Sequence, residues 1–173
     1  MPEQECIFCG IASGKIPAKK VYEDDRVVAV LDINPAVPGH LLVIPKEHVA
    51  VMPQMPVDLV RHVGIVAKKL SHELIKKLGV EGVSVFIANG GAAGQRAPHF
   101  IMHVIPREEG DGVQLDPPSA KIPDEQMRQV LEQLKPSVDK HFRGMQSESV
   151  QAQPKEQKKE GADLDTISDL LNG

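Results

Sequence analysis

Tryptophan is absent from this chain, and aromatic residues of any kind are scarce, with four phenylalanines and one tyrosine among 173 residues. The hydrophobic fraction of 41% is sufficient for the core of one small domain with extensions. No run of 18 apolar residues occurs, so the sequence predicts no transmembrane helix. The first ten residues contain neither a basic nor an apolar segment, so we expect a cytoplasmic protein that is neither exported nor bound to a membrane.

Positive charge and cysteine are also limited. A net charge of −4 gives no reason to expect a nucleic acid partner. The two cysteines, Cys6 and Cys9, are too few for a disulfide scaffold. Three positions apart, they fit a metal site or a redox pair in a reducing compartment, and two buried structural thiols are the plainer alternative.

The spacing of apolar residues predicts an α+β fold. We expect β-strands at five places: 21–23, 27–31, 41–45, 83–89 and 100–105. Residues 57–78 carry apolar side chains three and four positions apart, which predicts one long amphipathic helix that ends at Gly79. A second helix is expected over 124–142, with a break at Pro136.

Composition divides the chain into three parts. Residues 1–110 carry the strand and helix patterns and are expected to fold as one domain. Residues 111–144 read as a loop followed by the C-terminal helix. Residues 145–173 are rich in Gln, Glu, Lys and Ser, so we expect a disordered tail with a short amphipathic end.

The segment NGGAAGQRAPHFIMHVIP, residues 89–106, carries the strongest functional pattern. Alternate residues of a strand point to opposite faces, so His99, Ile101 and His103 share one face. The preceding glycines allow close backbone approach, and a loop of exposed N–H groups forms a cradle for an anion such as phosphate. A buried core strand with satisfied histidines would explain the same residues without a ligand.

In its motifs the chain resembles the histidine-triad (HIT) superfamily of nucleotide-binding hydrolases and transferases. HIT proteins have His-φ-His-φ-His-φ-φ, where φ is apolar, after an Asn-x-Gly…Gly-Gln loop; here HFIMHVI follows NGG…GQ. Two more similar blocks are CIFC at 6–9 and LDINP followed by PGHLLVIPKEH at 31–48. The resemblance covers about residues 5–107 and implies a five-stranded antiparallel sheet with one long helix, to which this chain adds a C-terminal helical extension. It departs from the family at the middle histidine, which is Ile101.

The resemblance also implies roles for matching residues. The expected nucleotide contacts are Phe8, Leu31 and Ile33 for the purine, Asp32 for the ribose hydroxyls, and Asn89, Gly94, Gln95, Arg96 and His103 for the phosphate. His40 would support the active histidines from behind. The family more often has a small hydroxyl residue near position 96, where Arg96 either adds a planar donor for phosphate or points to solvent.

A structural zinc ion is implied in the same way. Some zinc-binding members of the family place ligands where this chain has Cys6, Cys9, His48 and His99. Two thiolates and two imidazoles form a common tetrahedral zinc set. With His99 on zinc, the catalytic face consists of His103 and position 101.

Position 101 determines the expected chemistry. In the family the middle histidine attacks the α-phosphate and forms a covalent nucleotidyl-imidazole, which water then hydrolyses. Isoleucine has no lone pair, and His103 lies ~7 Å further along the strand, too far for in-line attack. We therefore predict binding of purine mononucleotides such as AMP or GMP, with weak turnover or none.

Three function classes remain open at this point. The first is a HIT-type nucleotidyl hydrolase or transferase, acting on phosphoramidates or dinucleotides in its parent form. The second is a non-catalytic nucleotide-binding module that regulates or binds a partner. The third is a zinc-stabilised structural domain, which does not require Asp32, Asn89, Gly94 and Gln95 together. HIT proteins commonly form two-fold dimers, so a homodimer is expected.

Overall fold

The computed structural model describes residues 6–115 and 117–143, so the expected tail at 145–173 lies outside the described residues. The chain divides into two compact units, Met1–Gln114 and Leu115–Gly173. No helix of the described residues is long and apolar enough to cross a membrane.

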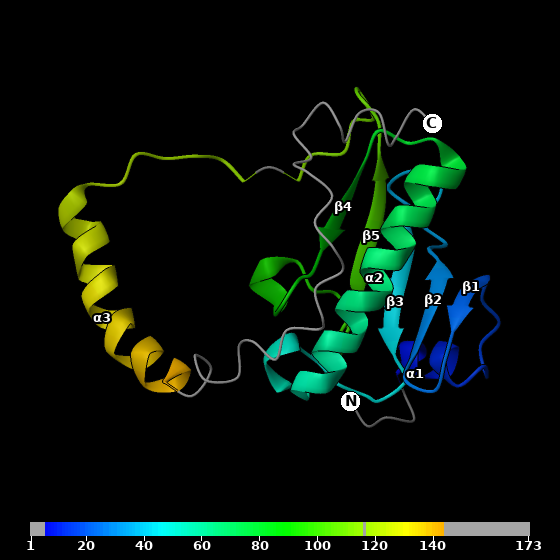
Figure 1. The fold of residues 1–173 in the computed structure, drawn as a ribbon, viewed down its shortest axis with the longest axis horizontal. Helices are drawn as coiled ribbons and strands as arrows, with labels where there is room; N and C mark the ends of the chain where they lie inside the picture. The colour runs from blue at the N-terminus through cyan, green and yellow to red at the C-terminus, as the bar shows by residue number, and fades with distance from the viewer. Residues whose placement is uncertain (1–5, 116, 144–173) are drawn as a thin grey trace, which may run out of the picture. The chain divides into compact units, whose positions relative to one another are not determined.

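The first unit is built on a five-stranded antiparallel sheet (Figure 1), which confirms the predicted fold class. Its elements in chain order are α1 (Ile7–Ala12), β1 (Lys20–Glu23), β2 (Val27–Leu31), β3 (Leu41–Pro45), α2 (Val57–Leu78), β4 (Gly82–Phe86) and β5 (Met102–Arg107). Single turns of 3₁₀-helix occur at Met52–Gln54 and Gly91–Ala93. The strand order is β1-β2-β3-β5-β4, so β5, the last strand in the chain, lies inside the sheet.

Helix α2 covers one face of the sheet, as Figure 1 shows, and its apolar stripe forms the main core. Leu59 and Val63 are each 1% exposed, and burial of one such side chain contributes about 1.5–3 kcal/mol relative to leaving it in water. The helix ends at Gly79, whose φ of 70° is left-handed and accessible to glycine at little cost. The predicted helix bounds are therefore confirmed.

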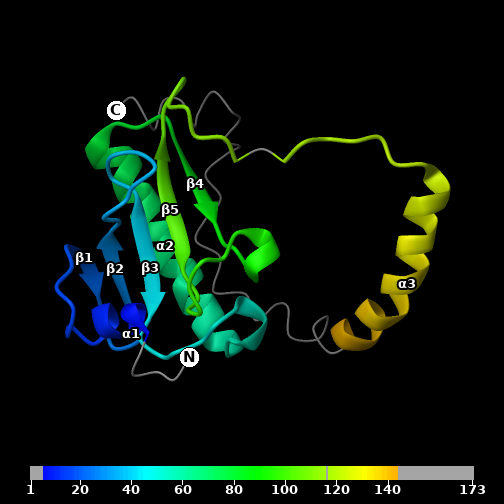
Figure 2. The same cartoon turned by 180° about the vertical axis from the view of Figure 1, so that it is seen from behind.

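The opposite face is covered in part by the short helix α1, visible from behind in Figure 2. Ala12 packs there with alternate residues of β2 and β3, and Ile101 lies against this second apolar cluster. The α2 side of the sheet buries Phe100, which precedes β5, together with Met102 and Val104 of β5. The predicted alternation is therefore present, with the intervening residues, Ile101 among them, on the α1 face.

Several element bounds differ from the sequence prediction. Strand β4 ends at Phe86 instead of residue 89, and β5 begins at Met102 instead of residue 100. The Phe100 amide is drawn out of the ladder because it donates to the Val49 carbonyl at 2.6 Å. Helix α1 has six residues, too few to show a helical period, and was not predicted.

Helix α3 (Asp124–Phe142) belongs to the second unit. The predicted break at Pro136 is wrong, since the helix continues through it. A proline removes one backbone hydrogen bond and strains the preceding turn, which bends a helix more often than it ends one. No residue of α3 is buried.

Candidate functional site

Four side chains predicted as metal ligands converge beside α1. The ligand atoms of Cys6, Cys9, His48 and His99 all lie within 4.8 Å of one another. The His99 Nδ1 atom is 3.5 Å from each sulfur, and the His48 Nδ1 atom is 3.1 Å from the Cys9 sulfur. A tetrahedron with zinc–sulfur bonds of about 2.3 Å and zinc–nitrogen bonds of about 2.0 Å separates sulfur from nitrogen by about 3.5 Å. The cluster therefore has the donor types and the spacing of a zinc site.

Main-chain groups orient His99 for this cluster. Its Nε2 atom is 3.0 Å from the Pro45 carbonyl oxygen, which only accepts, so Nε2 carries the proton. The lone pair of the neutral ring is then on Nδ1, which faces the sulfurs. A metal-bound histidine that donates its second N–H to a carbonyl is the usual arrangement in protein sites. Burial lowers the pKa of His99, partly offset by this hydrogen bond.

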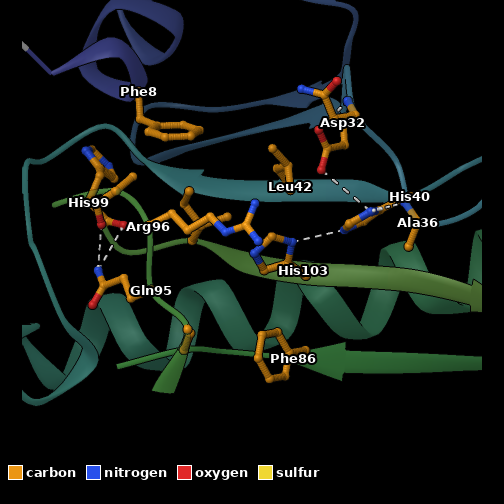
Figure 3. A pocket seen from close by; sticks show the side chains of 15 residues that line it. Phe8, Asp32, Ala36, His40, Leu42, Phe86, Gln95, Arg96, His99 and His103 are labelled. Atoms are coloured by element: carbon orange, nitrogen blue, oxygen red, sulfur yellow. Dashed lines mark hydrogen bonds and ion pairs between the residues drawn. The ribbon is translucent and has the colours of Figure 1, made fainter. Parts of the chain in front are cut away.

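A cavity of about 440 Å³ opens on the same face of the sheet, next to the metal cluster. Figure 3 shows its side chains. His99, Ile101 and His103 all line it, as the strand pattern predicted. Phe86 on β4 and Leu42 on β3 are the register partners of His103 and complete the wall.

His40 connects the cavity to the loop that follows β2. It is 5% exposed, and its Nε2 atom is 3.0 Å from Nδ1 of His103, with the two rings 5.1 Å apart between centroids. On the other side of the ring, Nδ1 accepts a hydrogen bond from the Ala36 amide at 3.2 Å. The Asp32 carboxylate is 3.6 Å from the same nitrogen, and Asp32 also accepts from the Asn34 amide. The predicted support of His103 by His40 is therefore a direct contact.

Both histidines favour the neutral form. Burial lowers the pKa of His40, an effect that the nearby Asp32 carboxylate partly offsets. Burial also lowers the pKa of His103, the proximity of His40 lowers it further, and Asp32 again raises it in part. Near pH 7 the cavity therefore contains two uncharged imidazoles.

Arg96 supplies positive charge to the cavity wall. Its side chain extends across the cavity in Figure 3, and the ring of His103 lies between His40 and the end of Arg96. Within residues 6–115 and 117–143 no hydrogen-bond or ion-pair partner of Arg96 is present. An unpaired guanidinium in a cavity is well suited to a phosphate or sulfate group.

Two residues predicted to hold phosphate instead stabilise the glycine loop through their side chains. The Gln95 amide accepts from the Gly90 N–H at 2.7 Å and donates to the carbonyls of Ala50 and Ala97. Asn89 accepts from the Met52 amide at 2.8 Å and does not line the cavity. Gln95 does line it, together with Gly94, whose φ of 88° is left-handed. These residues place the loop at the cavity edge.

The residues predicted to line a purine lie at two places. Phe8 lines the cavity, whereas Leu31 and Ile33 line a neighbouring hollow of about 690 Å³. Asp32 and His40 line both, so the two spaces meet at these side chains.

Several cavity-lining residues were not predicted: Asn34, Ala36, Leu42, Phe86, Ala88 and Ala97. Leu42 and Phe86 could have been found from strand register, because both lie opposite His103. Ala36 acts through its main-chain amide, which has no signature in the sequence.

Comparison with known proteins identifies a family and several similar proteins. The HIT domain family matches residues 13–110. An adenylylsulfatase of Arabidopsis thaliana is 37% identical over 109 residues, which are 63% of this chain and 55% of the plant protein. The chain thus spans about half the length of that relative.

Two solved structures share the architecture. A histidine triad nucleotide-binding protein from Candida albicans superposes with a TM-score of 0.71 at 33% identity, covering 79% of this chain and 99% of that protein. A zinc-bound histidine triad family protein from Mycobacterium smegmatis superposes with a TM-score of 0.62 at 32% identity, covering 78% and 99%. With more than half of its length inside the matched domain and the same five-stranded sheet, the chain belongs to the HIT family.

Proposed function

We propose that this chain binds purine nucleotides in the cavity and does not process them through a nucleotidyl-histidine intermediate. The observation that carries the proposal is Ile101, which lines the cavity together with His99 and His103. This is the position where the family's nucleophile is expected, and an alkyl side chain has neither a lone pair nor a proton to transfer. The cavity and its polar groups are present around it.

Each part of a nucleotide has a matching region. The hollow beside Leu31 and Ile33 offers apolar surface to a purine, and Asp32, where hollow and cavity meet, can accept hydrogen bonds from ribose hydroxyls. The phosphate would then lie in the cavity against Arg96 and His103. AMP or GMP is the proposed ligand, because a single phosphate is enough to accept hydrogen bonds from both Arg96 and His103.

The cysteine–histidine cluster is proposed to hold a structural zinc ion. The ligands would be Cys6, Cys9, His48 and His99. The ion would thereby join α1 to the segment after β3, which carries His48, and to the segment before β5, which carries His99. Support comes from the sulfur–nitrogen distances and from the proton position of His99. The ion would contribute stability, and the chemistry of the cavity would not pass through it.

A homodimer is proposed from the open edge of the sheet. Among the residues that the structure describes, strand β4 pairs only with β5, and its Val85 and Phe86 side chains are 52% and 38% exposed. An edge strand with exposed apolar side chains is a surface that proteins usually cover.

A non-catalytic regulatory module is the second candidate. Helix α3 has an exposed apolar stripe, formed by Met127, Val130, Leu131, Leu134, Val138 and Phe142. Such a stripe is typical of a helix that packs against a partner. This candidate keeps nucleotide binding and adds a protein partner.

The test compares three proteins: the chain itself, Ile101→His and Ile101→Val. We expect all three to bind AMP by calorimetry, and only Ile101→His to release AMP from an adenosine phosphoramidate. The valine variant is the matched control, since it changes shape without supplying a nucleophile. Rapid release by the unchanged chain would contradict the assignment of position 101, and absence of AMP binding by all three would contradict nucleotide binding.

A further inference from the structure

Three groups form a hydrogen-bonded row that ends at the cavity: the Ala36 amide, the His40 ring and the His103 ring. The Ala36 nitrogen is 3.2 Å from His40 Nδ1, and His40 Nε2 is 3.0 Å from His103 Nδ1. The remaining nitrogen of the row, His103 Nε2, lies on the other side of a ring that lines the cavity.

The chemistry of the first group determines the proton positions in the other two. A backbone amide only donates, so His40 Nδ1 must accept and carries no proton. The neutral His40 ring then has its proton on Nε2, and this N–H donates to His103 Nδ1. His103 Nδ1 is therefore also unprotonated, and the proton of that ring is on Nε2. Burial, which lowers the pKa of both rings, favours the same neutral forms.

A competing arrangement of the protons exists because a second polar group, the Asp32 carboxylate, also lies near His40 Nδ1. The Asp32 carboxylate oxygen is 3.6 Å from His40 Nδ1 and would accept a proton placed there. In that case His40 Nε2 would accept from His103 Nδ1–H, and His103 Nε2 would present a lone pair to the cavity. The amide at 3.2 Å is within hydrogen-bonding distance and the carboxylate at 3.6 Å is not, so the heavy-atom geometry favours the first arrangement.

We propose that the Ala36 amide is a positioning group that makes His103 present an N–H donor, and not a lone pair, to the cavity. With the Arg96 guanidinium lining the same cavity, the His103 N–H adds a second hydrogen-bond donor for one ligand group. Its ligand is then an ionised oxyanion, a phosphoryl or sulfonyl group that accepts hydrogen bonds. His103 in this state cannot act as a nucleophile or as a general base. The ligand class rests on the proposed function, whereas the direction of the row does not.

Nuclear magnetic resonance tests the direction without any ligand. Long-range ¹H–¹⁵N spectra distinguish protonated from bare ring nitrogens, and the His103 signals are identified by their loss in His103→Asn. We expect a protonated Nε2 and a bare Nδ1 at pH 7.5. The variant Ala36→Pro removes the N–H, and Ala36 is exposed, so a proline ring has room. His40 then carries its proton on Nδ1, where Asp32 accepts the hydrogen bond, and the two His103 nitrogens exchange their protonation states.

Two controls keep the test decisive. Ala36→Gly retains the amide and should leave the His103 spectrum unchanged. Asp32→Asn should also leave it unchanged if the amide sets the direction, and this variant decides the question should Ala36→Pro fail to fold. A charged His103, a proton on its Nδ1 in the unchanged chain, or a shift in Asp32→Asn would overturn the proposal.

Inorganic sulfate then tests the ligand class. Loss of a hydrogen bond to a charged group weakens binding by roughly 10-fold or more, so Ala36→Pro should bind sulfate at least ~10-fold less tightly than Ala36→Gly. Equal sulfate affinity with reversed ring protons would overturn the oxyanion as the ligand class of His103. The expected spectra without any binding of AMP would leave the direction established and refute the nucleotide-binding function instead.

Discussion

His99, which precedes β5, and His103, within β5, both line the cavity, and main-chain atoms give the two rings the same proton position. The Pro45 carbonyl accepts from His99 Nε2, which leaves the Nδ1 lone pair facing two sulfurs. The Ala36 amide, acting through His40, also leaves the proton of His103 on Nε2, but here the Nδ1 lone pair faces His40 and the Nε2–H faces the cavity. One histidine is thereby suited to a cation and the other to an anion, although the motif presents them as equivalent.

The metal assignment can be tested at the level of single side chains. Titration with Co²⁺ should give one equivalent bound per chain, with the near-ultraviolet absorption of a thiolate ligand. Cys9→Ser should weaken binding by about 10-fold or more, because removal of a direct ligand costs at least as much as loss of an outer hydrogen bond. His72→Ala, at an exposed histidine of α2 outside the cluster, is the matched control. Equal affinity in Cys9→Ser would exclude this site.

At the level of elements, Asp24 links the turn between β1 and β2 to helix α2. Its carboxylate accepts from the amides of Arg26 and Val27, each at 2.8 Å, from the Tyr22 hydroxyl and from His62 on α2 at 2.7 Å. Burial alone would raise the pKa of Asp24, but these hydrogen bonds hold it well below its ordinary value. One carboxylate therefore fixes a turn and joins it to the helix that covers the sheet.

This link predicts a pH-dependent stability. The folded-state pKa of Asp24 is depressed, so its stabilisation is complete above the unfolded pKa of about 3.9 and is lost as pH falls below that value. Asp24→Asn should lower the unfolding temperature by ~5 °C at pH 7. The difference between the two proteins should shrink as pH is lowered toward 3. Thermal scans across this range measure it, and a constant difference would exclude the carboxylate as its cause.

The sequence predicted the elements better than the groups that hold them in place. Helix 57–78 and the two faces of residues 99–104 follow from apolar spacing, because burial repeats with the period of the element. Loop residues gave no such signal. An amide such as Gln95 can face a ligand or the neighbouring main chain, and only the folded structure shows that it bonds four backbone groups. Ala36 could not have been found from its side chain at all.

At the scale of the whole molecule, the site-bearing unit contains all of its own core. Every residue of the two core clusters lies between Phe8 and Val104, and α3 buries no residue. The first unit ends at Gln114. Stability and site geometry should therefore not require the second unit.

A shortened chain ending at Gln114 tests this independence. We expect its unfolding temperature to lie within ~2 °C of the full chain, since both core clusters lie within the retained residues and each degree corresponds to a fraction of a kcal/mol. Its affinity for AMP should match that of the full chain. A much lower unfolding temperature, or a loss of AMP affinity, would show that residues 115–173 contribute to the folded unit.

Ile101 has a consequence for how such a protein would behave among its ligands. Under the proposed function, a nucleotide that enters the cavity leaves it chemically unchanged. The fraction of filled sites then depends only on the free ligand concentration and the dissociation constant: half at a concentration equal to the constant, and about nine-tenths at ~10-fold above it. An enzyme depletes its substrate, whereas the occupancy of this cavity would rise and fall reversibly with the concentration of its nucleotide.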